Sequence, residues 1–369
     1  MKNTFGSSVS VTLFGESHGP AIGAVLDGLA PGIPVENAAI EQALALRRPS
    51  GSISTARQEP DPFEIISGVF NGKTTGTPLC ILIRNTQARS DDYAATRALV
   101  RPGHADYTAF CKYHGFEDPR GGGHFSGRLT AALVAAGAVA TAALRGKGIC
   151  IGTHIARCGG VADRAFGDLE ADLEALRTLP FAALDAQAAA DMQAAVSAAA
   201  ADGDSVGGVL ETAVTGLPAG VGEPWFDTLE GVLAHALFSI PAVKGVEFGS
   251  GFAMAEGRGS EMNDAFRRED GKTVTATNHN GGVNGGISNG MPLLFHCAVK
   301  PTPSIFRPQQ TVDLFTGEEA TLQLTGRHDP AIVHRARAVV DAMTALTLCD
   351  QLALRFGTDW LAPAAEAAP

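Results

Sequence analysis

The sequence predicts one large α+β domain, and three observations lead to that fold class. Short strand-like runs and longer helical patterns occur along the 369 residues without regular alternation, which does not support a doubly wound parallel sheet. No period repeats and no linker interrupts the chain. Hydrophobic residues make up 45% and charged residues 18%, which excludes a disordered, collagenous or coiled-coil chain. We expect a single domain over residues 1–361 and a disordered tail over 362–369.

The first elements follow from local composition. The runs Val9 to Phe14 and Pro78 to Ile83 are typical of strands. Residues 35–46 have helical spacing and are followed by two arginines, where the helix dipole favours cations, and by Pro49, which ends a helix. Residues 129–145 are almost all alanine and aliphatic, so we expect a buried helix there.

The remaining elements divide by texture. Residues 161–205 are rich in alanine and carry nine acids against two bases, which predicts two exposed helices outside the fold with no role in chemistry. Residues 206–325 return to strand-like runs, of which Met291 to Val299 is clear. Residues 331–356 form a long helical pattern.

Charge and cysteine usage limit the possible partners. The net charge of −11 argues against a nucleic-acid partner, which needs excess cations. The N-terminus has no signal-peptide pattern, and the apolar run at 129–144 is short and weakly hydrophobic for a membrane span. None of the six cysteines forms a C-x-x-C pair, so no zinc or other metal site is expected. We expect a cytoplasmic protein with free thiols and no membrane partner.

Four histidines lie in loops punctuated by glycine or proline. His18 lies in 15–19, His104 in 101–106, His124 in 121–128 and His328 in 326–330. Three of these motifs also contain an arginine. Histidine exchanges protons near neutral pH, and arginine binds phosphate or carboxylate with a planar fork of donors. Together the motifs predict a shared site for anions.

Further loops favour anion binding. Residues 121–128 lead into the predicted helix at Leu129, and three glycines there allow successive N–H groups to point at one anion. A tight turn without a ligand is the alternative. Arg47, Arg48 and Arg57 bracket a Ser/Gly loop that could close over a ligand, and 278–286 and 300–304 add two more loops. Their spread predicts a large polyanionic ligand set.

Two familiar motifs fit poorly. Residues 67–74 nearly match a P-loop, but Ser67 replaces its first glycine and no helix is expected after it. Residues 286–290 match G-x-S-x-G, which makes a serine hydrolase the second hypothesis. That motif needs a strand before it and a helix after it, whereas here a Gly/Asn-rich loop precedes a strand. Labelling with a serine-directed phosphonate discriminates the two hypotheses.

The motifs taken together resemble one enzyme family. They are GESHG at 15–19, RPGHADYT at 101–108, RGGG at 120–123, VKGVEFG at 243–249, GGISNG at 285–290, KPT at 300–302 and GRHDP at 326–330. In this order they are similar to chorismate synthase over about residues 5–355. The resemblance implies a β-α-β sandwich with antiparallel sheets in the core and helices outside.

The resemblance also implies a reaction. The family is a carbon–oxygen lyase that removes phosphate from 5-enolpyruvylshikimate 3-phosphate by 1,4-anti-elimination, giving chorismate, the last common step of aromatic amino-acid biosynthesis. It requires reduced FMN although no net redox change occurs, and it assembles as a homotetramer. A degenerate flavin- or phosphate-binding relative without catalysis is a third hypothesis.

Residue roles follow from matching the motifs. His104 would protonate the departing phosphate, His18 would protonate or stabilise reduced flavin, and Asp329 would help remove the substrate hydrogen through the flavin. Substrate anions would be bound by Arg47, Arg57, Arg128 and Arg327. Flavin contacts would come from His124, Phe125, Ser126, Ala242, Gly285, Lys300, Pro301, Thr302, Pro303, Ser304 and Arg327.

The chain departs from the family pattern at several flavin and NADP positions. His124 and Phe125 stand where Arg-Ser is usual, Pro303 stands where serine is usual, and Ile53 replaces a basic residue. Arg47 is the one matched position that the family links to NADP. NADPH would therefore act only indirectly, and an external flavin reductase or reducing system would supply reduced FMN.

Overall fold

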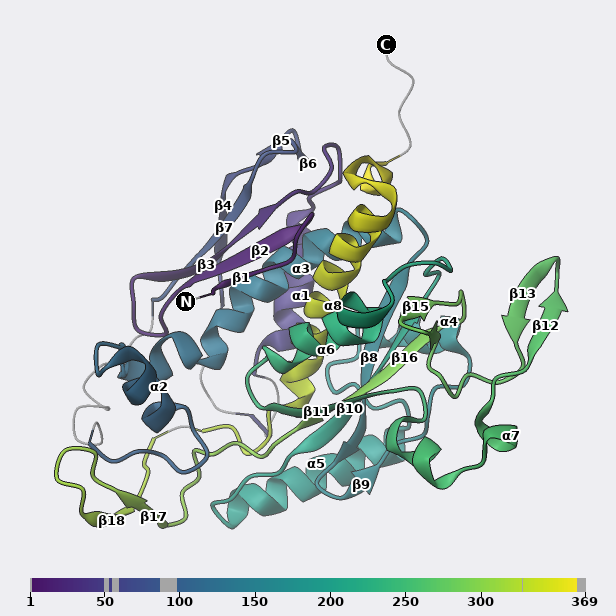
Figure 1. The fold of residues 1–369 in the computed structure, drawn as a ribbon. Coiled ribbons are helices and arrows are strands. Elements are labelled where there is room, and N and C mark those ends of the chain that lie inside the picture. Colours follow the sequence, from purple (N-terminus) through teal and green to yellow (C-terminus); the bar gives the residue numbers. More distant parts are fainter. Residues whose placement is uncertain (1, 50–52, 55–59, 87–97, 327, 364–369) are drawn as a thin grey trace.

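The computed structural model describes residues 2–49, 53–54, 60–86, 98–326 and 328–363, and within them two five-stranded antiparallel sheets enclose a layer of helices (Figure 1). The first sheet has the order β1-β2-β3-β7-β4, formed by Thr4–Phe5, Ser10–Gly15, Ala21–Asp27, Leu79–Arg84 and Phe63–Ser67. The second has the order β11-β16-β10-β8-β9, formed by Val243–Phe248, Leu293–Val299, Gly208–Thr215, Cys150–Cys158 and Val161–Ala162.

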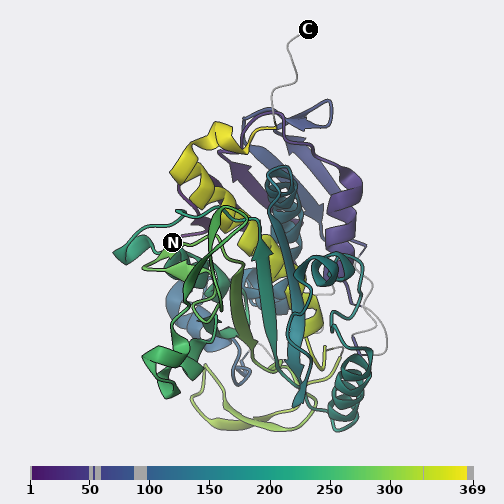
Figure 2. The same cartoon turned by 90° about the vertical axis from the view of Figure 1, so that its right-hand side faces the viewer.

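The helices between the sheets form the centre of the molecule. They are α1 (Asn37–Arg47), α3 (Thr130–Arg145), α6 (Leu229–Phe238) and α8 (Val333–Phe356). Helix α3 packs against β3 and β7 of the first sheet, α8 packs against β8 and β10 of the second, and α3 and α8 pack against each other. Figure 2 shows α8 running diagonally between the two sheets.

The α+β class and the sandwich of antiparallel sheets are confirmed, but the expected order of the layers is wrong. The central helices lie inside and the sheets lie outside. The physical reason is that α3 is apolar around almost its whole circumference and α8 is buried around almost all of its own, so each is covered on both sides. A sheet with one apolar face needs cover on one side only.

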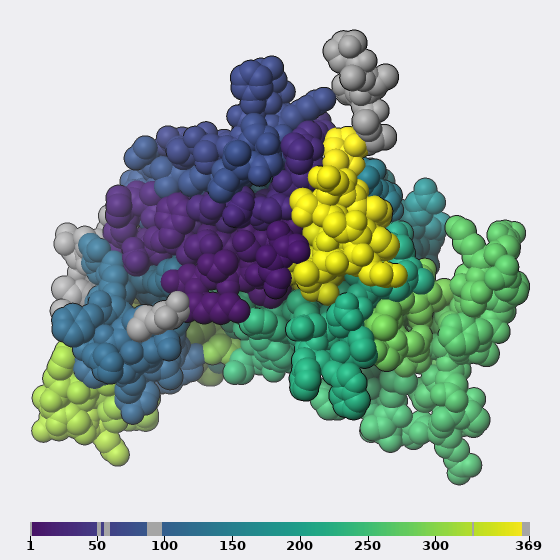
Figure 3. All heavy atoms as spheres, turned by 45° about the horizontal axis from the view of Figure 1, so that its top comes forward, coloured from purple at the N-terminus to yellow at the C-terminus, as the bar shows by residue number. Residues whose placement is uncertain are grey.

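Helices α3 and α8 approach each other very closely. A Cβ atom built on Gly137 of α3 would lie 2.3 Å from the Cβ of Ala342 on α8, so only glycine permits this contact. The segment Gly127–Arg145 is long and apolar enough to cross a membrane, but 72% of it is buried inside the fold. It is the expected buried core helix. Figure 3 shows the C-terminal end of α8 reaching the surface beside the first sheet.

Smaller elements lie around this core. The helices α2 (Asp106–Tyr113), α4 (Leu169–Leu176), α5 (Ala186–Ala201) and α7 (Gly259–Met262) are peripheral, as are the hairpins β5–β6 (Val69–Phe70, Lys73–Thr74), β12–β13 (Phe266–Glu269, Lys272–Thr275), β14–β15 (Val283–Asn284, Ile287–Ser288) and β17–β18 (Gln309–Val312, Glu319–Leu322). Short 3-10 helices span Arg120–Phe125, Gly127–Leu129, Trp225–Asp227, Gly251–Glu256 and Thr358–Leu361. The prediction of two helices within 161–205 is confirmed by α4 and α5.

Candidate active site

A turn of three consecutive glycines lies between two of the predicted histidines. Gly121, Gly122 and Gly123 have φ angles of 59°, 83° and 53°, which favour glycine. A Cβ on Gly121 would lie 2.2 Å from Cε1 of His18, and a Cβ on Gly122 would lie 3.3 Å from Cε1 of His104. The backbone of this turn therefore fits between the two imidazole rings only because it carries no side chains.

His104 is held by a carboxylate of its own motif. Its Nδ1 lies 2.6 Å from Oδ1 of Asp106. Because an ionised carboxylate only accepts, we assign the proton to Nδ1, which leaves Nε2 on the side of Gly122. Arg101 donates to both oxygens of Asp106, from Nε at 2.8 Å and from a terminal nitrogen at 2.7 Å. Burial alone would raise the pKa of Asp106, but the hydrogen bonds from Arg101 and His104 hold it well below its usual range.

Arg47 and Arg128 meet at a buried carboxylate. Asp61 forms ion pairs with both guanidinium groups, and its side chain is 1% exposed. Arg47 also donates to the hydroxyl of Thr130 at 2.9 Å and to the carbonyl of Gly127 at 2.8 Å. Two fixed cations and one anion leave this end of the site with net positive charge at the start of α3.

Asn85 joins the arginine pair to the loop of His18. Its side-chain oxygen accepts a hydrogen bond from Nε of Arg128 at 3.1 Å. Its amide nitrogen donates to the carbonyls of Glu16 and Gly19, each at 2.9 Å. The loop before β3 is therefore fixed to the same arginine that Asp61 holds.

The residues after the glycine turn are engaged within the protein. His124 Nδ1 lies 2.8 Å from the carbonyl oxygen of Gly15, so it carries the proton and donates. The ring of Phe125 packs edge-on against Tyr113, with centroids 6.0 Å apart. The hydroxyl of Ser126 caps the following 3-10 helix. His124, one of the three predicted flavin contacts, thus uses one ring nitrogen to join its own loop to the end of β2.

Two residues near 326–330 contact different parts of the site, namely the histidine end around His104 and the arginine end around Arg47 and Arg128. His328 lines the same cavity as His104, and burial together with the charge of Arg101 lowers its pKa. The carboxylate of Asp329 lies 2.5 Å from a terminal nitrogen of Arg335, whose Nε donates to the carbonyl of Arg47 at 2.8 Å. Asp329 therefore belongs to the arginine end and His328 to the histidine end.

The segment 300–304 approaches the motif of His104. The amine of Lys300 donates to the carbonyl of Gly103, and its backbone N–H donates to the carbonyl of Ala242 at 2.9 Å. Ala242 has a φ of 75°, which is rare for a residue with a side chain. Within the described residues, the hydroxyl of Thr302 is buried and has no hydrogen-bond partner. These contacts bring Lys300, Ala242 and the neighbouring hydroxyls to one place.

Gly285, a predicted flavin contact, lies away from the histidines and the glycine turn. It lies at the turn of the β14–β15 hairpin, with a φ of 61° and open space where a side chain would be. The next residue, Gly286, accepts a hydrogen bond from the N–H of Leu229 at the start of α6. Figure 1 shows β15 well separated from α2, which begins at Asp106.

A cavity of about 150 Å³ opens at the histidine end. Its lining includes Arg101, His104, Gly122, Phe125, Phe315 and His328. Phe315 follows the strand β17 and packs edge-on against Phe110 of α2, so α2 and the β17–β18 hairpin meet beside this cavity. The charged lining comprises Arg101 and the carboxylates of Asp106, Glu117 and Asp118, next to His104 and His328.

Two predicted substrate ligands, Arg57 and Arg327, lie outside the described residues. Sequence reasoning missed four residues that organise the site, namely Asp61, Asn85, Asp106 and Arg335. Asp106 could have been found, because it lies two positions from His104 in the same motif. Asp61 and Asn85 carry no local signal, since their partners are 67 and 43 positions away.

The serine of the G-x-S-x-G motif has a structural role. Ser288 is buried, donates to the carbonyl of Pro218 at 2.6 Å and accepts from the N–H of Val221 at 2.9 Å. It lies in the two-residue strand β15, and the next element is β16, so no helix follows it. The geometry is not that of a nucleophile elbow.

Comparison with known proteins identifies the family. The model of the chorismate synthase family matches residues 9–353. The chain belongs to the chorismate synthase family. It is 49% identical over 351 residues to the chorismate synthase of Methanocella arvoryzae, covering 95% of this chain and 94% of the relative. It is also 49% identical over 356 residues to that of Methanosarcina mazei, covering 96% and 97%.

A solved structure of this family has the same fold. A crystal structure of chorismate synthase matches with a TM-score of 0.73 at 29% identity, covering 95% of this chain and 94% of that one. The protein is accordingly a lyase of aromatic amino-acid biosynthesis. The two histidines and the glycine turn belong to the motifs GESHG, RPGHADYT and RGGG, by which the sequence resembles this family.

Proposed function

We propose that the protein converts 5-enolpyruvylshikimate 3-phosphate to chorismate and phosphate by 1,4-anti-elimination and depends on reduced FMN. In this reaction the bond from carbon to the phosphate oxygen breaks and one proton leaves the substrate ring. The observation that carries the proposal is the glycine turn, whose backbone separates His18 from His104. Such a turn can bind an anion between two groups that exchange protons near neutral pH.

His104 is the proposed donor to the departing phosphate. The hydrogen bond from Nδ1 to Asp106 fixes the ring and leaves Nε2 to hold or deliver a proton. A carboxylate against imidazole also stabilises the protonated ring. Asp106 is therefore a positioning residue, and Arg101 in turn fixes Asp106.

Arg47 and Arg128 are the proposed binding groups for substrate anions, together with Arg57 and Arg327. Asp61 compensates one of the two buried charges, and the remaining positive charge attracts the carboxylates of the substrate. Asp329 is placed next to this end by Arg335, and the ion pair keeps its carboxylate oriented. His18 is the proposed group beside the flavin.

The residues near 300–304 fit the phosphate of FMN. Lys300 supplies a cation, the unpartnered hydroxyl of Thr302 is a buried donor, and Ser304 adds a second buried hydroxyl. The remaining proposed contacts are His124, Phe125, Ser126, Ala242, Gly285, Pro301 and Pro303. Reduced FMN, when bound, would supply electron density to the substrate. Arg47 is 3% exposed and engaged with Asp61, which supports only an indirect role for NADPH.

The proposed biological setting is a homotetramer in the cytoplasm with an external reducing system for FMN. Exposed aromatic side chains support assembly, since Trp225, Phe226 and Phe252 are 82%, 95% and 83% exposed. A single domain over 1–361 also stays a prediction. Light scattering of the purified protein would test the assembly, and a monomer at micromolar concentration would contradict it.

The deciding experiment is an anaerobic assay of phosphate release. We expect turnover with reduced FMN and none with oxidised FMN in air. Phosphate release that is indifferent to flavin would contradict the proposal, and binding of flavin without turnover would instead indicate a non-catalytic relative. Treatment with a serine-directed phosphonate should neither label Ser288 nor inhibit the enzyme, because that hydroxyl is buried.

The same assay on His124→Arg tests the departure from the family pattern. Arginine also donates to a carbonyl, so the link to Gly15 can persist, and we expect turnover within about threefold of wild type. His124→Ala, which removes the donor, is the matched control and should show weaker FMN binding. Equal behaviour of both variants would mean that the link to Gly15 does not matter.

A further inference from the structure

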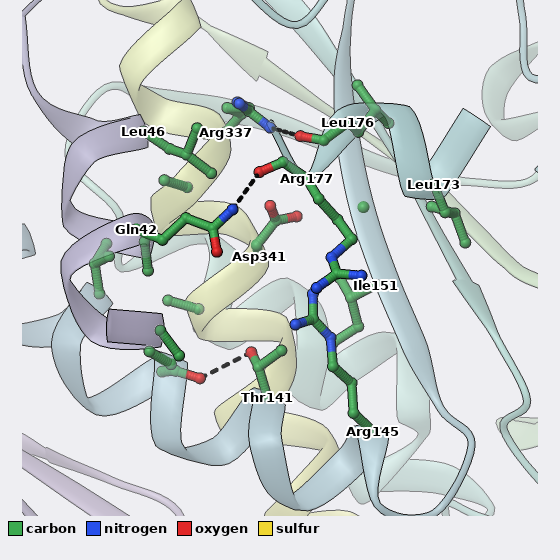
Figure 4. Close-up of a pocket in the computed structure, with 18 residues that line it drawn as sticks. Gln42, Leu46, Thr141, Arg145, Ile151, Leu173, Leu176, Arg177, Arg337 and Asp341 are labelled. Carbon is green, nitrogen blue, oxygen red and sulfur yellow. Dashed lines mark hydrogen bonds between the residues drawn. The ribbon is translucent and has the colours of Figure 1, made fainter. Parts of the chain in front are cut away.

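A second pocket lies between the helices, away from the histidine cavity. It is bounded by one face of α1, α3 and α8, by β8 and by α4, and has a volume of about 100 Å³ with an opening to solvent (Figure 4). None of the residues that line it belongs to the proposed active site. Its charged members are Arg145, Arg177, Arg337 and Asp341.

Two arginines come to this pocket from different helix ends. Arg145 is the last residue of α3, and Arg177 follows the last residue of α4. Figure 4 shows their guanidinium groups lying beside each other. An anion beside them is attracted by both charges and offsets their mutual repulsion, so the pair favours binding of an anion. Arg177 also pairs with Glu174, whereas no hydrogen bond or ion pair engages Arg145 among the described residues.

A carboxylate faces the same space. One oxygen of Asp341 accepts the hydroxyl proton of Thr153 at 2.6 Å. Within the described residues no ion pair reaches Asp341, although Arg337 lies one helical turn before it. Figure 4 shows the carboxylate between Gln42 and the backbone of Arg177. Its second oxygen is therefore available to a donor in the pocket.

The walls are built before any ligand arrives. Arg337 is 1% exposed and donates to the carbonyls of Leu176 and Leu179, which fixes the end of α4. Its Nε is buried and has no hydrogen-bond partner among the described residues. Gln42 donates to the carbonyl of Arg177 at 3.2 Å and so joins α1 to α4. These contacts hold the end of α4 against α1 and α8, so the wall of the pocket is fixed without a ligand.

Apolar side chains complete the lining. They are Leu46, Val134, Ile151, Leu173 and Leu176. A cavity of about 150 Å³ accepts a benzene ring, so this smaller pocket holds only the aliphatic side chain of a ligand. The charged groups of the ligand then lie towards the opening to solvent, where Arg145 and Arg177 are exposed. Cations, an anion and an apolar surface within one pocket match the three parts of an α-amino acid.

We propose that this pocket binds a small zwitterionic amino acid with a short aliphatic side chain. Its carboxylate lies on Arg145 and Arg177, its ammonium group lies on Asp341, and its side chain lies among the leucines. Binding is independent of the proposed lyase reaction, since no active-site residue takes part.

Calorimetric titration of the full-length protein with L-leucine tests the proposal. We expect L-leucine to bind at least tenfold more tightly than 4-methylpentanoate, which lacks the amine, or 3-methylbutylamine, which lacks the carboxylate. Equal binding of the three probes, or no binding of L-leucine at millimolar concentration, would overturn it.

Matched variants assign the contacts. Arg145→Gln and Asp341→Asn should each weaken L-leucine binding at least tenfold, whereas Arg267→Gln, which removes one exposed charge on the β12–β13 hairpin, should leave it unchanged. Asn keeps an acceptor for Thr153, so the fold is preserved. Phosphate release by Arg145→Gln should equal that of wild type, which separates this proposal from the lyase reaction. Unchanged L-leucine affinity in both variants would also overturn the proposal.

The pH dependence gives a further readout. Burial raises the pKa of Asp341 to about 6 despite Thr153 and the cations Arg337 and Arg145. The other charged groups at the pocket are Arg177 and its partner Glu174. An ammonium ligand needs ionised Asp341, so L-leucine binding should weaken below about pH 6, while binding of 4-methylpentanoate should not. Weakening of both probes alike would contradict the assignment of Asp341.

Discussion

The two ends of the candidate active site use the same device for different chemistry. At one end the carboxylate of Asp106 holds His104, and at the other the carboxylate of Asp61 holds Arg47 and Arg128. Imidazole gains and loses a proton near neutral pH, whereas guanidinium stays charged. A carboxylate therefore orients the proposed proton donor in one case and holds fixed charges together in the other. The partner of each carboxylate, and not the carboxylate itself, therefore decides what each end can do.

The largest expected effect comes from changing the glycine turn that joins the two ends. Gly121→Ala places a methyl group 2.2 Å from His18, so either the turn or the histidine must move, and turnover should fall more than about hundredfold. Gly72→Ala is the matched control, since Gly72 also has a positive φ but no atom within 4 Å. Equal loss of turnover in both variants would mean that backbone strain, not the contact with His18, is responsible.

At the histidine end, His104→Ala should lower turnover about 10²–10⁴-fold with little change in stability, because it removes the proposed proton donor. His114→Ala, which changes an exposed histidine at the end of α2, is the control. Single-turnover phosphate release measures the effect. Near-normal turnover of His104→Ala would remove this histidine from the reaction.

Asp106→Asn separates positioning from proton transfer. It keeps the shape but removes the charge that stabilises protonated His104, so kcat should fall about tenfold or more while KM changes little. The pH profile of kcat should also shift to lower pH, because protonated imidazole loses its stabilising partner. A change in KM alone would indicate a merely structural role.

At the arginine end, Asp61→Asn should act mainly on binding. Losing the carboxylate frees two buried guanidinium groups from their common partner, so the substrate meets a less ordered site and KM should rise about tenfold. Glu64→Gln, which breaks an exposed pair with Arg84, is the control and should have no effect. A fall in kcat at constant KM would contradict the assignment of substrate binding to the arginine end and of proton transfer to the histidine end.

The smallest effect concerns stability. His334 is 2% exposed, its Nε2 lies 2.7 Å from the hydroxyl of Ser54, and burial lowers its pKa to about 4. In the unfolded chain the imidazole of His334 binds a proton below about pH 6.5, whereas in the folded chain it does so only below about pH 4. The free energy of unfolding therefore decreases as the pH falls from about 6.5 to about 4. Between pH 6.5 and 5 the loss should be about 1–2 kcal/mol.

Denaturant unfolding at the two pH values measures this loss, and His334→Gln should reduce it. His104 differs in this respect, because its Nδ1 contacts the carboxylate of Asp106, whereas Nε2 of His334 contacts only the hydroxyl of Ser54. An unchanged pH dependence in His334→Gln would assign the acid sensitivity to other groups.

Much of the fold could be predicted from residue patterns, but the order of the layers could not. Periodicity located β2, β7, β16, α1, α3 and α8 to within about two residues at most ends. An all-apolar helix such as α3 must be buried, but nothing in its composition says whether sheets or helices cover it. Layer order depends on contacts between distant segments, which no local pattern contains.

The candidate site divides in a similar way. His18, His104 and the glycine turn are visible because each lies in a short motif of unusual composition. The carboxylate of Asp61 is invisible in sequence, because it gains meaning only when the fold brings it to Arg128, 67 positions away. Sequence therefore indicates the candidate reacting groups better than the groups that orient them.

The contact between Gly137 and Ala342 has a consequence for how the protein can vary. It sets the spacing of α3 and α8, and the candidate active site lies where these two helices and α1 begin or end. A single added methyl group at this crossing would move α3 and α8 apart, and so change the distance between Arg128 and Asp329, which lie just before the first residues of these two helices. The small residues of the core also explain why only 6% of the chain is aromatic. Helices packed this closely leave no room between them for aromatic rings. Substitutions by larger side chains should therefore be accepted at the surface of the molecule and not between α3 and α8.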